Sequence, residues 1–244
     1  MSFWQKIKKN FLYKIKQDLL SLIKYPKINL SSSGQVDYDE YWRARRREVA
    51  VLSRYQKQRA DIVLKIIEKG AKVLDVGCGD GAVLKYLKDQ ANIEGIGVDL
   101  SEKILTQAKQ IGIEVIQMDI TKLENLEALP EADYILGFEI LEHLPNPEEF
   151  ILKMKNKARQ GLIFSFPNSG YFRHRLRLLL GRFPLQWVYH PGEHLRFWTV
   201  KDVKWWAAAF GFDLDRLIVY EGPLGLRKIW PALFGEGIII KIKK

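Results

Sequence analysis

The stretch that most constrains the fold is KVLDVGCGDG, at residues 72–81. Its apolar residues predict a buried strand over 72–76, with Asp75 near the end of that strand. Glycines then stand at every second position, namely Gly77, Gly79 and Gly81. Because glycine has no Cβ atom, the chain can turn sharply there, and a ligand can approach the backbone N–H groups. The pattern therefore predicts a strand, a ligand-binding turn and a helix.

A second apolar run follows about twenty residues later and strengthens this interpretation. It predicts a strand over 93–98 that ends at Asp99, where a carboxylate can accept hydrogen bonds from a ribose diol. Strand, glycine turn, helix and acidic strand end together indicate the adenosine-binding half of a Rossmann-like sheet.

The identity of the adenosine cofactor depends on Asp75. The run GCGDGA also satisfies the G-x-G-x-x-[GA] pattern of NAD-binding proteins, so NAD is an alternative. A carboxylate beside the turn would repel a pyrophosphate but would attract the ammonium and sulfonium groups of S-adenosylmethionine. The order D-x-G-x-G-x-G therefore favours S-adenosylmethionine.

Four segments resemble the class I S-adenosylmethionine-dependent methyltransferases. They are VLDVGCGDG, IGVDLS, VIQMDI and DYILGFEILEHLPNP. The resemblance covers roughly residues 38–243. It implies an α/β fold with a seven-stranded, mostly parallel sheet in the order 3-2-1-4-5-7-6, with the seventh strand antiparallel and helices on both faces.

The resemblance also implies how the cofactor is held. The glycine turn and Asp75 would hold its methionine end, Asp99 its ribose and Asp119 the edge of its adenine. The complete set of expected cofactor-binding residues is Asp75, Gly77, Cys78, Gly79, Gly81, Asp99, Leu100, Asp119, Ile120 and Glu139. We interpret Cys78 as a small packing residue, since methyl transfer does not need a cysteine nucleophile.

Apolar periodicity and capping residues predict the remaining elements. The predicted strands lie at 72–76, 93–98, 114–118, 133–138, 162–166, 213–220 and 237–242, and the predicted helices include 81–89 and 101–111. Ser101 and Thr199 are expected to cap helices, and Gly211 is expected to close the second of them. Asn146 and Pro147 predict a helix start, with Glu149 completing a capping box.

Two histidines are candidates for a catalytic base. His143 follows the fourth predicted strand and is the preferred base, and His194 precedes a predicted helix and is the second choice. His174 and His190 are weaker candidates. A base is needed only where the methyl acceptor is a weak acid or a protonated amine, and a lone histidine is more often a structural residue.

The same segment contains a possible metal-binding pattern. Glu139, Glu142 and His143 form E-x-x-E-H, and His194 could supply a fourth ligand. The pattern resembles the metal site of small-RNA 2′-O-methyltransferases and also a segment of quinone-biosynthesis O-methyltransferases. Since similar segments occur in relatives without a metal, we expect no metal and keep this set as an alternative.

Positive charge is concentrated at the amino terminus. The chain of 244 residues has a net charge of +10, and residues 1–30 contain seven lysines and one aspartate. Apolar residues at helical spacing predict a basic amphipathic helix over 2–24, which suits either an anionic membrane surface or a protein interface. No apolar run is long enough to span a membrane, and the one cysteine suits a reducing compartment, so we expect a cytoplasmic protein.

Composition shifts divide the chain into three predicted parts. These are a basic helix at 1–30, a linker and helical cap at 31–71, and a methyltransferase domain at 72–244 that contains a basic insertion at 169–193. In the insertion, Phe172, Leu176, Leu179 and Leu180 predict an apolar helix face, and Arg173, Arg175 and Arg177 predict a basic one.

The expected function is methyl transfer from S-adenosylmethionine to a small molecule, quinone, lipid or glycan. The segment LIFSFPNSGYFRHRLRLLLGR also resembles MetW-type proteins, which leaves open a partner protein that binds the cofactor without turnover. A metal-assisted RNA methyltransferase is the third alternative, suggested by the positive charge. The sequence does not decide the acceptor or the oligomeric state.

Overall fold

The computed structural model describes residues 20, 22–25, 51–186 and 191–244. Its centre is one seven-stranded sheet in the order β3-β2-β1-β4-β5-β7-β6. The strands are β1 (Lys72–Val76), β2 (Glu94–Asp99), β3 (Glu114–Gln117), β4 (Ala132–Phe138), β5 (Ala158–Pro167), β6 (Leu214–Tyr220) and β7 (Gly237–Lys243). β1 to β5 pair in parallel, and β7 runs antiparallel to both β5 and β6. The predicted fold class and strand order are therefore confirmed.

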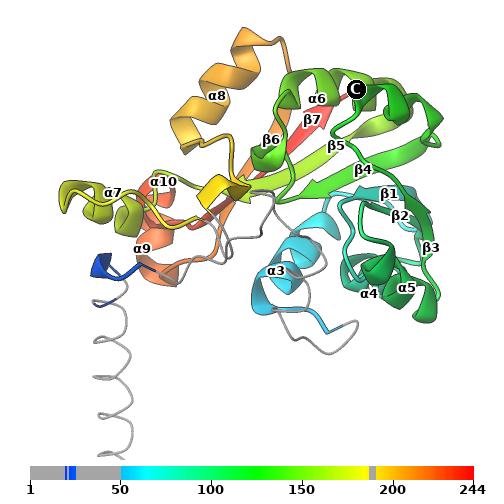
Figure 1. Cartoon of the computed structure of the whole chain (residues 1–244), viewed down its shortest axis with the longest axis horizontal. Coiled ribbons are helices and arrows are strands. Elements are labelled where there is room, and N and C mark those ends of the chain that lie inside the picture. Colours follow the sequence, from blue (N-terminus) through cyan, green and yellow to red (C-terminus); the bar gives the residue numbers. More distant parts are fainter. Residues whose placement is uncertain (1–19, 21, 26–50, 187–190) are drawn as a thin grey trace, which may run out of the picture.

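Helices cover both faces of the sheet (Figure 1). The helices are α3 (Arg54–Val63), α4 (Ala82–Ala91), α5 (Glu102–Gln110), α6 (Pro147–Lys157), α7 (Phe172–Leu179), α8 (Val200–Ala209), α9 (Leu224–Ile229) and α10 (Pro231–Phe234). Three 3-10 turns join them, namely η1 (Leu123–Ala128), η2 (Leu141–His143) and η3 (Pro191–Glu193). In Figure 1, α3, α4 and α5 lie on one face, and α6 and α8 lie on the other. Each face has its own apolar core.

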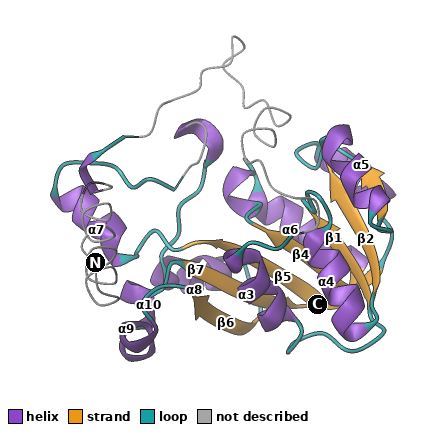
Figure 2. Cartoon of the chain, turned by 90° about the horizontal axis from the view of Figure 1, so that it is seen from below, coloured by secondary structure: helices purple, strands orange, loops and turns teal. Residues whose placement is uncertain are grey.

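Three further helices gather at one end of the sheet (Figure 2). These are α7, α9 and α10, and the rings of Phe172 and Phe234 lie 5.6 Å apart where α7 meets α10. None of the described helices is both long and apolar enough to pass through a bilayer.

Two of the three predicted helix caps form as expected. The hydroxyl of Ser101 accepts a hydrogen bond from the backbone N–H of Ile104, and Thr199 forms a capping box with Asp202. Gly211, with φ +69°, closes α8 as predicted. Asn146 is the N-cap of α6 and Pro147 follows it, but the Asn146 side chain makes no capping hydrogen bond, so the predicted capping box with Glu149 is wrong. Its backbone, at φ −127° and ψ 67°, departs from the extended conformation that aims a capping side chain at the first turn.

The prediction of a basic face on α7 is wrong at one position. Arg175 is exposed, whereas Arg177 is 3% exposed because it lies under the start of the described chain. The guanidinium of Arg177 donates to the carbonyl oxygens of Leu22 and Lys24, and it lies 5.3 Å from the ring of Tyr25. On the expected apolar face, Leu179 is 82% exposed and Leu180 is also exposed.

Several predictions fall outside the described residues. They are most of the basic helix over 2–24, the linker at 31–34, the first part of the helical cap and His190. Leu20, Leu22 and Ile23 are helical, as predicted. The proposed division of the chain at residues 30 and 71 stays a prediction.

Candidate active site

A cavity of about 730 Å³ lies at the carboxyl ends of the parallel strands. The predicted site residues that line it are Asp75, Gly77, Cys78, Gly79, Asp99, Leu100, Asp119, Ile120, Glu139, His143 and His194. Gly81 and Glu142 are not among the residues that line the cavity. Gly81 is the N-cap of α4, and Glu142 is buried in η2. The topology thus brings the two predicted halves of the site, cofactor and base, to one cavity.

The glycine turn is shaped by backbone conformations that other residues seldom adopt. Gly77 has φ +78°, and a Cβ atom there would collide with the side chain of Ile140. The N–H groups of Gly77 and Cys78 both donate to the carbonyl oxygen of Val98, at 2.7 and 3.0 Å. These bonds fasten the turn to β2, so it is rigid before any ligand arrives.

Asp75 has the burial and charge expected of a group that binds an ammonium. It is 2% exposed, and its Oδ1 has no hydrogen-bond partner among the described residues. Burial and the nearby charge of Asp99 raise the pKa of Asp75 to about 7, and Arg59 opposes that shift. An unpartnered buried carboxylate is costly, and an ammonium would supply the missing partner. The site therefore fits the amino group of S-adenosylmethionine.

Asp99 and Asp119 suit the ribose and the adenine of the same cofactor. Asp99 accepts hydrogen bonds from the N–H groups of Gly79 and Ser101, both at 3.0 Å, although burial still raises its pKa. These bonds hold the carboxylate at the cavity wall, where it can accept from ribose hydroxyls. Asp119 accepts from the N–H and hydroxyl of Thr121, at 3.0 and 2.6 Å, and its position suits the adenine edge.

Cys78 is buried and behaves as a packing residue. Its sulfur occupies the space that a Cβ atom on Gly97 would need. Burial and three nearby carboxylates raise the pKa of its thiol well above the ordinary value, which keeps the thiolate scarce.

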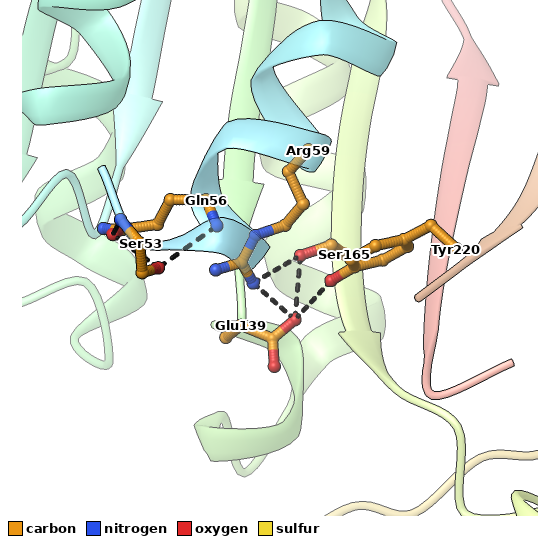
Figure 3. A network of polar contacts seen from close by, with 6 residues as sticks. All are labelled: Ser53, Gln56, Arg59, Glu139, Ser165 and Tyr220. Carbon is orange, nitrogen blue, oxygen red and sulfur yellow. Dashed lines mark hydrogen bonds and ion pairs between the residues drawn. The ribbon is translucent and has the colours of Figure 1, made fainter. Parts of the chain in front are cut away.

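Arg59 is a site residue that the sequence interpretation missed. Its guanidinium lies 2.8 Å from Glu139 Oε1 and also donates to the hydroxyl of Ser165 (Figure 3). The hydroxyls of Ser165 and Tyr220 donate to the same oxygen of Glu139, at 2.9 and 3.5 Å. Arg59 lies on the buried face of α3 with Ala60 and Val63. An arginine on an otherwise apolar helix face was the signal that could have found it.

The first turn of α3 makes further polar contacts. A capping box between Ser53 and Gln56 starts the helix. Tyr55 donates to Glu236 Oε2 at 2.7 Å, and Arg54 lies 3.2 Å from the buried carboxylate of Glu221. The helix is thus fastened to loops that follow β4 and β6 and precede β7.

A pair of histidines lines the same cavity. The rings of His143 and His194 are perpendicular, with centroids 4.8 Å apart. His143 Nδ1 lies 2.5 Å from the carbonyl oxygen of Glu193, and because a carbonyl only accepts, Nδ1 carries the proton. Burial and the neighbouring His143 lower the pKa of His194 to about 3, so His194 is neutral at pH 7.

Glu139 does not join the four-residue metal set that the sequence suggested. It has φ +56°, precedes η2 and turns its carboxylate toward Arg59. The residues that come together are Glu142, His143 and His194. Burial, together with the charge of Glu139, raises the pKa of Glu142 well above its ordinary value. His174 also lines the cavity, and burial lowers its pKa to about 4.

The strand order, the glycine turn and the carboxylates at the ends of β1, β2 and β3 are those of the class I S-adenosylmethionine-dependent methyltransferase fold. The model of one family, described as "Methionine biosynthesis protein MetW", matches residues 57–242. The chain therefore belongs to the MetW family, and the predicted resemblance is confirmed.

The individual relatives fall into two groups, namely methionine biosynthesis proteins and ubiquinone biosynthesis O-methyltransferases. The chain is 27% identical over 183 residues to a bifunctional methionine biosynthesis protein MetXA/MetW of Rhodopirellula baltica, a match that covers 68% of this chain and 29% of that protein. It is 39% identical over 159 residues to a ubiquinone biosynthesis O-methyltransferase of Dechloromonas aromatica, covering 61% of this chain and 67% of that one. The chain thus spans less than a third of the first relative.

Solved structures of low sequence identity share the fold. A SAM-dependent methyltransferase from Archaeoglobus fulgidus superposes with a TM-score of 0.59 at 21% identity, covering 85% of this chain and all of that one. Magnesium protoporphyrin IX methyltransferase from Synechocystis PCC 6803, with bound SAH, has a TM-score of 0.58 at 19% identity, covering 87% and 95%.

Proposed function

We propose that this chain transfers a methyl group from S-adenosylmethionine to an acceptor held in the cavity beside His143. The observation that carries the proposal is Asp75, a buried carboxylate whose Oδ1 lacks a partner in the described structure and lies beside a glycine turn. That arrangement suits an ammonium, and the same cavity continues to the histidine pair.

Each cofactor residue has a separate task in this proposal. Asp75 accepts from the ammonium, Asp99 from the ribose diol and Asp119 from the adenine amino group. The N–H groups of Gly77, Cys78 and Gly79 already donate to Val98 and Asp99, so the glycine turn contributes room for the methionine end rather than donors. Bound S-adenosylmethionine supplies an activated methyl group on its sulfonium. Because that leaving group is already good, holding the reactants in line supplies much of the rate.

The histidine pair would activate the acceptor. Glu193 holds the proton of His143 on Nδ1, so Nε2 is the basic nitrogen of that ring. An acceptor hydroxyl gives up its proton, its electron pair forms the bond to the methyl carbon, and the sulfur keeps the pair of the broken carbon–sulfur bond. His143 is the preferred group for this step and His194 the second.

Labelled S-adenosylmethionine and fractionated cell extract provide the test. We expect label in one fraction, lowered about 10²- to 10⁴-fold by His143→Ala while calorimetric affinity for the cofactor is retained. Cofactor binding without label in any fraction would instead favour a partner protein that binds the cofactor and does not turn over.

The relatives support a small-molecule acceptor, and the name of the Dechloromonas protein favours a quinone precursor with a hydroxyl group. The RNA alternative rests on the net charge of +10 and on the E-x-x-E-H pattern at residues 139–143. RNA binding that weakens steeply with salt would favour that alternative.

We also propose that a cytoplasmic, anionic membrane surface is where the protein meets an apolar acceptor. Residues 169–192 contain four arginines and no acidic residue, and they expose a cluster of apolar side chains. This cluster consists of Leu178, Leu179, Leu180 and Phe183. Apolar side chains among cations suit the boundary between anionic headgroups and acyl chains.

Flotation with anionic liposomes tests whether this apolar cluster binds a membrane. Leu179→Glu should reduce the bound fraction several-fold, whereas the control Leu152→Glu, on the exposed side of α6, should not. Deletion of residues 1–30 should also reduce flotation, and equal flotation after both changes would refute the membrane proposal.

A further inference from the structure

Three potential metal ligands converge at the wall of the cavity. Glu142 and His143 are adjacent in η2, and His194 follows η3. One ligand atom from each of these residues lies within 4.8 Å of the other two. The loop that carries His194 is fastened here, because the N–H groups of Leu195 and Arg196 both donate to the backbone carbonyl of Glu142, at 2.7 and 3.1 Å.

The carboxylate of Glu142 needs a partner that the described protein does not supply. The residue is 1% exposed, and both of its carboxylate oxygens are buried without a hydrogen bond to any described residue. Burying a carboxylate in this way is costly unless a cation or donors compensate it. Two imidazoles stand next to it, and neutral imidazole is a ligand for divalent transition metals.

His143 is oriented as a metal ligand would be. Its Nδ1 donates to the carbonyl of Glu193, which is the outer contact that commonly fixes a coordinating histidine, and which would make Nε2 the coordinating nitrogen. His143 and His194 line the cavity, whereas Glu142 lies behind them. An ion among the three would therefore keep its remaining coordination positions on the cavity side.

We propose that Glu142, His143 and His194 bind one divalent transition-metal ion, which in turn binds the oxygen of the methyl acceptor. Bonds of about 2.0–2.2 Å place ligand atoms roughly 3.4 Å apart, so the three groups close by a little over 1 Å when the ion binds. Glu139 is outside this site, because its carboxylate is held by Arg59 and Ser165. The role toward the acceptor rests on the proposed function and replaces its base when the ion is bound, because Nε2 of His143 then binds the ion and cannot take a proton. The ion would lower the pKa of the acceptor hydroxyl, so that its proton passes to water and its oxygen supplies the electron pair for the bond to the methyl carbon.

Titration of the full chain with Co²⁺ tests the site. Protein dialysed against a chelator should bind one Co²⁺ per chain, with visible absorption bands of an ion bound by nitrogen and oxygen. Glu142→Gln and His194→Gln should each weaken binding at least about 100-fold, since each removes one of three ligands. Glu139→Gln is the matched control, because it removes a nearby carboxylate that the geometry places outside the site, and it should change the affinity less than about threefold.

Two results would overturn the inference. One is wild-type protein that binds no Co²⁺ at micromolar concentration, which does not depend on any variant folding. The other is Co²⁺ binding that Glu142→Gln and His194→Gln leave unchanged. Calorimetry with S-adenosylmethionine on the same samples separates the two proposals, since cofactor binding without metal binding refutes only the metal, and loss of cofactor binding in the wild type refutes the methyltransferase.

Discussion

The two walls of the cavity are built in different ways. The proposed cofactor wall consists of Asp75, the glycine turn, Asp99 and Asp119, all within 45 consecutive residues and all at strand ends. The proposed acceptor wall, with Arg59, His143 and His194, draws on α3, η2 and the loop before α8. The first wall comes from residues close together in the chain, and the second depends on tertiary contacts.

The largest expected effect tests the cofactor wall. Asp99→Ala should weaken S-adenosylmethionine binding at least about 100-fold, because two charge-assisted hydrogen bonds of about 1.5–3 kcal/mol each are lost. Calorimetry measures the affinity, and Asp89→Ala, on an exposed part of α4, is the control. Unchanged binding of S-adenosylmethionine by Asp99→Ala would refute the assignment of Asp99 as the ribose-binding residue.

The next effect tests the acceptor wall through its stability. Arg59→Met should lower the free energy of unfolding by about 2 kcal/mol, since Glu139 loses its cation in a partly buried place. Urea denaturation measures it. Adding Glu139→Gln should recover part of the loss because these residues are in contact, whereas strictly additive losses would show that the pair is not coupled.

A pH series tests Asp75 on the proposed cofactor wall. The pKa of about 7 for Asp75, raised by burial and by Asp99 against the opposing charge of Arg59, means that lowering the pH protonates this carboxyl. Cofactor affinity should therefore rise about tenfold per pH unit between pH 5.5 and 6.5 and level off above about pH 7. Asp75→Asn should bind weakly without this slope, and a slope that survives in the variant would assign it to another group.

The smallest effect compares two helix caps. Ser101→Ala should cost about 1 kcal/mol of stability, because the serine hydroxyl accepts from the N–H of Ile104. Asn146→Ala should cost close to nothing, since the Asn146 side chain caps no N–H group. Thermal unfolding of both variants tests this, and an equal loss would contradict the difference in geometry.

Local rules explain what the sequence could predict. Apolar periodicity located all seven strands, because it depends on neighbours in the chain. The spacing of Asp75, the glycines and Asp99, together with the family resemblance that supplied Asp119, predicted residues that line one cavity. The capping box at Asn146 was predicted wrongly although the residue types fit, because the backbone of Asn146 has φ −127° and ψ 67° and its side chain makes no capping hydrogen bond.

Contacts between distant residues explain what the sequence could not predict. Arg59 and Glu139 are 80 positions apart, and Arg177 is buried by carbonyl groups more than 150 positions away. Nothing in the local pattern around Glu139 distinguishes a partner of arginine from a metal ligand. The choice between them depends on where α3 packs.

The attachment of α3 has a consequence for biosynthesis. Its partners Glu221 and Glu236 follow β5 and β6 in the chain, so a ribosome-bound polypeptide that has emerged only through β5 contains the glycine turn but lacks the carboxylates that contact Arg54 and Tyr55. Domains fold as units during synthesis at about 5–20 residues per second. The cavity is therefore completed only after β7 has been synthesised and has inserted between β5 and β6.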